Sequence, residues 1–264
     1  VQGHKPTYGL VPETGVIPLS TSLDHVGPLA RDVETLWRAM HVLADWGDAP
    51  QLAATDLTSI RIGVWDGVGD VSSTPAVAAG FARVVSDLEQ SGATLSRLAP
   101  PVYDYSKSRR AGLLVSEIEG AREHGVTADG PRPDGLSDVF YSLLHWGTRQ
   151  DAAKSQAAYA HIADVHRAAA SVWEHVDVLI APTAPQEAFD FDDGAPANQA
   201  DFTAWADFAR LPATAVFTGL SDAGLPLSIQ VIGPEGHDRE TLQVAAALEN
   251  RFGKPPAPPG FALA

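Results

Sequence analysis

Apolar and polar positions follow two different periods along this chain. Apolar residues recur at helical spacing over residues 32–44, which predicts a helix that Asp32 opens. The pattern then predicts a strand over 59–65, a helix that Thr74 caps and Pro75 begins and that stops at Gly92, and a strand over 94–98. Strand, helix and strand in this order predict a right-handed crossover within a parallel sheet.

The second half of the chain continues the alternation. Its predicted elements are a helical stretch over 107–175 interrupted at 125–135, a strand over 177–181, a polar loop over 184–200, strands over 214–218 and 226–232, and a helix over 239–252. After Asp177, residues 178–181 of the strand over 177–181 are all apolar, as in strands that are buried on both faces. A proline-rich tail follows from residue 255. We therefore expect an α/β fold in which helices cover a mixed sheet.

Composition narrows the classes of protein. The 264 residues are 45% hydrophobic and 19% charged and contain no apolar run of membrane-spanning length, so we expect no membrane association. The formal net charge of −15 repels nucleic acid, and we expect no nucleic-acid partner. The chain has no Cys, which excludes a thiol nucleophile and Cys-ligated metals. No signal peptide is recognisable, which predicts a cytoplasmic location.

Three separated segments carry a resemblance to a known family. They are Gly3-His-Lys-Pro-Thr-Tyr-Gly9 with Ser22-Leu-Asp-His-Val-Gly-Pro28, then Val176-Asp-Val-Leu-Ile-Ala-Pro-Thr-Ala-Pro185, then Leu211-Pro-Ala-Thr-Ala with Gly224-Leu-Pro-Leu-Ser-Ile-Gln-Val-Ile-Gly233. Together they span most of the chain, and in this order they resemble segments of the amidase-signature enzymes. That family hydrolyses carboxamides with a Ser–Ser–Lys triad. The resemblance implies its α/β fold, with no cofactor and no metal.

The residues that perform the family's chemistry belong to motifs that this sequence does not contain. Members resemble one another in a G-G-S-S-G-G stretch and a G-S-D-x-G-G-S stretch, which supply the two Ser, and in an earlier Lys that acts as the base. Here Ser72-Ser73 is followed by Thr-Pro, and no Gly-Gly-Ser occurs. We therefore expect residues 1–264 to be the C-terminal portion of one amidase-signature domain, an incomplete domain without a catalytic residue and with the triad upstream.

The resemblance leaves three interpretations of function. The favoured one is part of an amidase that hydrolyses a small carboxamide through a Ser acyl-enzyme and is completed by an N-terminal half or a complementing chain. One alternative is a catalytically inactive, amidase-like binding protein or partner. The other is a component similar to the A subunit of an amidotransferase. A homodimer is compatible with each of them.

Four residues are candidates for contact with the substrate. The resemblance implies that Ser22 and Asp24 belong to a segment that shapes the wall near the nucleophile, although Asp24 is equally suited to fixing a turn. Trp205 and Phe217 belong to an aromatic group beside the predicted strands over 214–218 and 226–232, which the Gly and Asp content of residues 220–225 predicts to form a hairpin. The partly helical spacing of this aromatic group favours core packing and leaves an apolar substrate pocket as the alternative. Lys5 is expected to be exposed and to play no part as the base.

Overall fold

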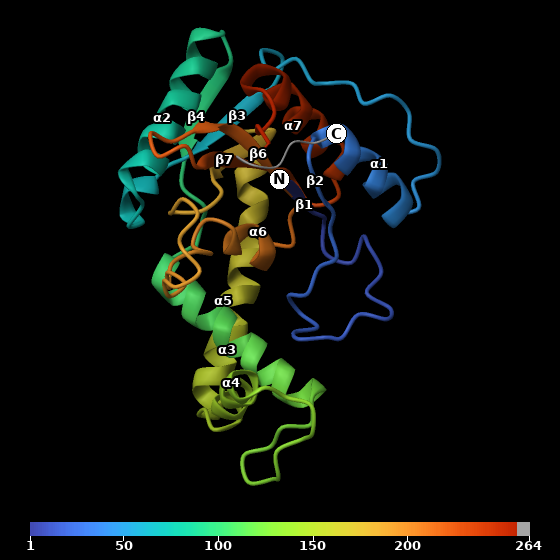
Figure 1. The fold of residues 1–264 in the computed structure, drawn as a ribbon, viewed down its shortest axis with the longest axis vertical. Helices are drawn as coiled ribbons and strands as arrows, with labels where there is room; N and C mark the ends of the chain where they lie inside the picture. Colours follow the sequence, from blue (N-terminus) through green and yellow to red (C-terminus); the bar gives the residue numbers. More distant parts are fainter. Residues whose placement is uncertain (258–264) are drawn as a thin grey trace.

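A computed structural model describes residues 1–257 and places seven strands in one mixed sheet (Figure 1). The strands are β1 (Gln2–Lys5), β2 (Leu29–Ala30), β3 (Arg61–Trp65), β4 (Thr94–Leu98), β5 (Val178–Pro182), β6 (Ala213–Leu220) and β7 (Pro226–Ile232). Their order across the sheet is β2-β1-β6-β7-β5-β3-β4. Strand β3 runs parallel to β4 and β5, as the predicted crossover requires. The pairs β1–β2, β1–β6, β6–β7 and β5–β7 are antiparallel.

Helices alternate with the strands. They are α1 (Val33–Leu43), α2 (Pro75–Gln90), α3 (Tyr105–Glu123), α4 (Asp138–Thr148), α5 (Ala152–Ala169), α6 (Ala204–Phe208) and α7 (Asp238–Phe252), with 3-10 turns η1 (Val68–Asp70) and η2 (Ala170–Glu174). Helix α2 begins where Thr74 Oγ1 accepts a hydrogen bond from the backbone N–H of Val77 and Pro75 occupies the first turn, which confirms its predicted start. Asp32 caps α1 in the same way.

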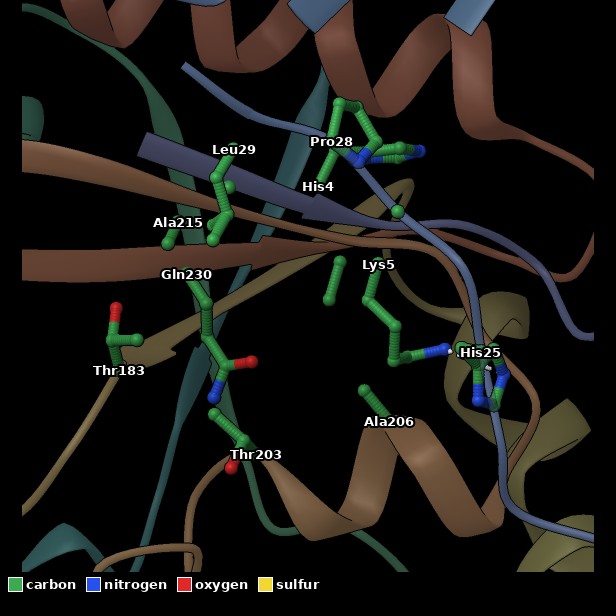
Figure 2. Close-up of a pocket in the computed structure, with 13 residues that line it drawn as sticks. His4, Lys5, His25, Pro28, Leu29, Thr183, Thr203, Ala206, Ala215 and Gln230 are labelled. Atoms are coloured by element: carbon green, nitrogen blue, oxygen red, sulfur yellow. Dashed lines mark hydrogen bonds between the residues drawn. The ribbon is translucent and has the colours of Figure 1, made fainter. Parts of the chain in front are cut away.

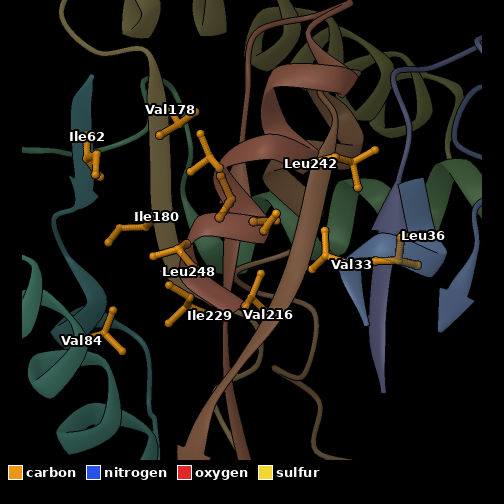
Figure 3. Packing of buried hydrophobic residues seen from close by; sticks show 14 of the residues in the cluster. Val33, Leu36, Ile62, Val84, Val178, Ile180, Val216, Ile229, Leu242 and Leu248 are labelled. Atoms are coloured by element: carbon orange, nitrogen blue, oxygen red, sulfur yellow. The ribbon is translucent and has the colours of Figure 1, made fainter. Parts of the chain in front are cut away.

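The two faces of the sheet carry different helices. On one face, α1, α2 and α7 pack against alternate strand residues such as Val178 and Ile180 (Figure 3). On the other face, α5, η2 and α6 pack against the intervening residues Leu179 and Ala181. All five residues of β5 are buried, which confirms the prediction of a strand covered on both sides. A cavity opens on the second face, beside α6.

Helices α3, α4 and part of α5 form an arm that extends away from the sheet (Figure 1). Helix α3 packs on α5 through a cluster that includes Leu114 and Ala158, and on α4 through Ala121 and Leu144. The predicted break at 125–135 falls between α3 and α4. In the part of the chain that the structure describes, no helix is both long enough and apolar enough to span a bilayer.

Three short elements are absent from the sequence-based prediction. Strand β1 has four residues, β2 has two and α6 has five. Segments of this length contain too few positions for a strand or helix period to be recognised. The predicted proline-rich tail lies partly outside the described residues.

Candidate functional site

A cavity of about 360 Å³ opens on the sheet face that α6 also covers (Figure 2). Strands β1, β6 and β7 contribute to it, together with α6 and residues 25–29. The hollow exists because small side chains face one another across the β1–β6 ladder, where Gly3 pairs with Ala215. Lys5 pairs with Ala213 in the same ladder, so a long charged side chain lies among short ones.

Lys5 takes part in a chain of hydrogen bonds at one end of this cavity. Its Nζ donates to the carbonyl oxygen of Pro6 at 3.0 Å and to Nε2 of His25 at 3.2 Å. Because Nε2 of His25 accepts, Nδ1 carries the ring proton. Nδ1 lies 2.8 Å from the carbonyl oxygen of Leu23 and 3.0 Å from Oδ1 of Asp207 on α6. Lys5, His25 and Asp207 thus join β1, the following loop and α6.

The surroundings of Lys5 disfavour its positive charge. Burial lowers the pKa of Lys5 to about 8, and the opposite charges of Asp207 and Asp238 offset that shift only in part. The expectation that Lys5 is exposed is therefore wrong. Strand β1, which the sequence pattern does not reveal, carries this side chain into the sheet beside β6.

Gln230 supplies a hydrogen-bond acceptor on another wall of the cavity. The residue is 2% exposed, and its Nε2 donates to the carbonyl oxygens of Pro182 at 3.1 Å and Phe202 at 2.7 Å. These bonds fix the side-chain amide so that its oxygen points into the cavity, toward the side where Lys5 lies (Figure 2). Within residues 1–257 that oxygen receives no hydrogen bond. Oγ1 of Thr183, also at the cavity, is buried without a partner in the same part of the chain.

A second cavity, of about 370 Å³, lies between α3, α6 and the segment over 19–24. Its charged lining residues are Asp24, Arg109 and Asp207. Because Asp207 also contacts His25, which lines the first cavity, the His25–Asp207 contact lies between the two hollows.

The predicted wall residues Ser22 and Asp24 are anchored in different ways. Ser22 donates from its backbone N–H and from Oγ to the carboxylate of Glu119 on α3, at 3.0 and 2.6 Å, and Oγ of Ser20 donates to the same carboxylate at 2.7 Å. Asp24 accepts from the backbone N–H groups of Leu19 and Ser20, at 2.8 and 3.0 Å, which is the turn-fixing role that the sequence offered as its alternative. Contact of either residue with a substrate stays a prediction.

Trp205 and Phe217 are both buried. The Trp205 ring, on α6, is fully buried and packs edge-on against Trp65 with ring centroids 5.7 Å apart. Phe217 is 8% exposed and lies two residues beyond Ala215 on the same face of β6. Their burial agrees with the core packing that the aromatic spacing favours, and their contact with a substrate stays a prediction.

The sequence did not identify Lys5, His25 and Gln230 as a group. All three lie in segments that carry the family resemblance, and this is the one signal that points to them. What unites them is the pairing of β1 with β6 and of β6 with β7, which no local pattern indicates. Over residues 1–257, no three His, Asp or Glu side chains gather as a metal site would require.

Comparisons with known proteins show which family this chain belongs to. The Amidase family matches residues 1–242. The chain is 31% identical to the A subunit of glutamyl-tRNA(Gln) amidotransferase from Symbiobacterium thermophilum, over 94% of this chain and 59% of that protein. It is 28% identical to 2-amino-5-chloromuconic acid deaminase of Comamonas testosteroni, over 96% of this chain and 56% of that one. A crystal structure of an amidase shares the fold with a TM-score of 0.83 at 24% identity, over 96% of this chain and 58% of that chain. The chain therefore spans less than two thirds of the length of these relatives, and the match over most of its own length shows that it belongs to the amidase family.

Proposed function

We propose that this chain forms part of an enzyme that hydrolyses a small carboxamide through a Ser acyl-enzyme. Membership of the amidase family carries the proposal. It is supported by a cavity in which Lys5 can donate to a carbonyl oxygen and Gln230 can accept from an amide N–H. The relative from Symbiobacterium thermophilum is longer, since this chain spans 59% of it, so further polypeptide would complete the site.

In this proposal the nucleophilic Ser, the bridging Ser and the Lys base lie outside residues 1–264. A Ser hydroxyl is a weak nucleophile, so an adjacent base must take its proton. The Ser oxygen attacks the amide carbon, ammonia or an amine leaves, and water then hydrolyses the ester and releases the acid. Backbone N–H groups of a Gly-rich segment would hold the oxyanion, each contributing about 3–4 kcal/mol of transition-state stabilisation. This chain contributes the sheet and the cavity walls.

An amidotransferase-like role is the second candidate, because a relative is named as the A subunit of glutamyl-tRNA(Gln) amidotransferase. In that role the chain would work within a complex, and a different polypeptide would contact the RNA, since a net charge of −15 disfavours direct contact. The lack of triad motifs in the sequence also suits a catalytically inactive partner.

Labelling with a fluorophosphonate, which reacts with activated Ser, tests the proposal. The chain alone is expected to stay unlabelled and inactive. A longer protein that includes the residues encoded upstream of Val1 is expected to be labelled at a Ser outside residues 1–264 and to release the amine or ammonia from a small carboxamide. Stoichiometric labelling within residues 1–264, mapped by mass spectrometry, would contradict the proposal. A longer protein that is neither labelled nor active would favour the inactive partner.

A further inference from the structure

The cavity on the sheet presents one cationic donor and one neutral acceptor from two different strands. Nζ of Lys5 uses two of its three N–H groups on Pro6 and His25, which leaves one for a ligand. The oxygen of Gln230 is a free acceptor within residues 1–257, held in place by the two bonds that its nitrogen donates. Apart from His and Thr side chains, the other lining residues are Gly, Ala, Pro and Leu.

We propose that Lys5 and Gln230 form an amide-binding subsite. The carbonyl oxygen of a small carboxamide accepts the remaining N–H of Lys5, and an N–H of the same carboxamide donates to the oxygen of Gln230. A cavity of about 360 Å³ holds a small molecule, and its apolar lining accommodates a short hydrocarbon tail.

The donor and the acceptor at the cavity favour a carboxamide over a carboxylate or an ammonium. A carboxylate would pair with Lys5, but it would bring a second acceptor against the oxygen of Gln230. An ammonium would satisfy Gln230 but would meet the positive charge of Lys5. A carboxamide carries one acceptor and one donor and no charge, so it satisfies both groups without burying a further charge.

His25 acts as a positioning residue for this subsite. A Lys side chain is a flexible four-carbon stem with a rotatable ammonium, so its donors have no fixed direction of their own. Nε2 of His25 and the carbonyl oxygen of Pro6 hold two of the three donors. Asp207 and the Leu23 carbonyl in turn hold Nδ1 of His25. The third donor of Lys5 is therefore directed by its neighbours.

Three ligands of nearly equal size test the subsite from the ligand side. Propionamide carries both groups, butanone keeps the carbonyl and lacks the N–H, and propionate replaces the N–H by a second acceptor. Titration of the ¹⁵N-labelled chain is expected to show saturable shifts at Lys5, Ala213 and Ala215 with propionamide. Butanone is expected to bind about threefold to tenfold more weakly, as the loss of a neutral hydrogen bond predicts, and propionate is also expected to bind more weakly. Equal affinities, or no saturable binding of propionamide, would overturn the assignment.

Two substitutions test it from the protein side. Lys5→Met removes the donor and is expected to weaken propionamide binding about tenfold or more, as the loss of a charged hydrogen bond predicts, while Lys5→Arg keeps a donor and is expected to recover part of the affinity. Circular dichroism confirms that each variant is folded. Unchanged affinity in folded Lys5→Met would overturn the assignment.

The subsite deepens the proposed function by placing the substrate amide, yet it is tested by binding alone. Failure of the subsite would therefore be distinguishable from failure of the acyl-enzyme proposal, which rests on family membership and is tested by Ser labelling.

Discussion

Lys5 holds a positive charge where burial disfavours it. A desolvated ammonium raises the free energy of the folded state unless its partners compensate. The opposite charges of Asp207 and Asp238 compensate only in part for burial, and the pKa of Lys5 accordingly falls to about 8. This residue therefore lowers stability while it supplies the cation of the cavity.

The pH dependence of stability checks this account of Lys5. The pKa of Lys in an unfolded chain is about 10.4, whereas the pKa of Lys5 in the folded chain is about 8. Between these values the unfolded chain binds more protons than the folded one, so the free energy of unfolding rises with pH through this window, and the cost of the charge is fully present below it. We expect Lys5→Met to remove this rise and to increase the urea midpoint at pH 7.

The control is Lys107→Met, at an exposed position on α3, which is expected to leave the pH profile unchanged. A urea midpoint for Lys5→Met below that of the wild type would show the opposite balance, in which the bonds to Pro6 and His25 outweigh the cost of burial.

Individual side-chain roles at the cavity could not be predicted from the sequence. Gln230 occupies a strand whose pattern indicates only that some of its residues are buried. Its orientation is set by carbonyl oxygens of Pro182 and Phe202, which lie 48 and 28 residues away in the chain. The same limit applies to Asp24, where a turn and a substrate contact require the same residue type in the same segment.

Among the elements, those with local signals could be predicted. Helix α2 has its cap and Pro at the start, and β5 has a continuous apolar run, so both follow from a few adjacent residues. Strand β1 has no such signal, because its place depends on pairing with β6, which joins Gly3 to Ala215. Since the cavity is built on that pairing, the fold class was predictable and the cavity was not.

A carboxylate of the arm anchors the segment over 18–25, and His124 at the end of α3 adds a contact from Nε2 to the carbonyl oxygen of Pro18 at 2.9 Å. Glu119 of α3 accepts from the Oγ atoms of Ser20 and Ser22 and from the backbone N–H of Ser22. Burial raises the pKa of Glu119, but the hydrogen bonds from Ser22 and Ser20 outweigh burial and hold the pKa below its ordinary value. The wall that carries Asp24 thus depends on an ionised side chain of another element.

Glu119→Gln is expected to lower the free energy of unfolding by about 1–3 kcal/mol at pH 7, because the amide nitrogen cannot accept these hydrogen bonds. A lowered carboxylate pKa contributes stability above the unfolded value of about 4.3, and this contribution is lost as pH falls through the lower folded value. The difference between the wild type and the variant should therefore shrink toward pH 3. Urea unfolding at both pH values measures it.

Glu123→Gln, at an exposed position on the same helix, is the matched control and should change stability little. An equal loss in both variants would show that helix charge, rather than the anchoring of residues 18–25, is responsible.

At the scale of the whole molecule, large apolar side chains are exposed at many positions, and two of these positions bear on association with another polypeptide. Leu29, which is 77% exposed, lies on the short edge strand β2 and lines the open cavity. Val139, which is 73% exposed, lies on α4 at the far end of the arm (Figure 1). Exposed apolar patches and unpaired strand edges favour association with another polypeptide.

If further polypeptide completes the sheet face, the isolated chain should self-associate or bind a hydrophobic dye through that face. We expect Leu29→Lys, on the edge strand, to reduce self-association and dye binding with little change in stability, since the side chain is exposed. Val139→Lys, on the arm, is the matched control and should leave both properties unchanged. Light scattering and dye fluorescence on the same preparations measure them. If Val139→Lys alone abolishes association, the arm is the interface. That outcome would support a homodimer formed through the arm. A monomer that binds no dye and melts sharply would instead show that residues 1–264 form a self-sufficient unit.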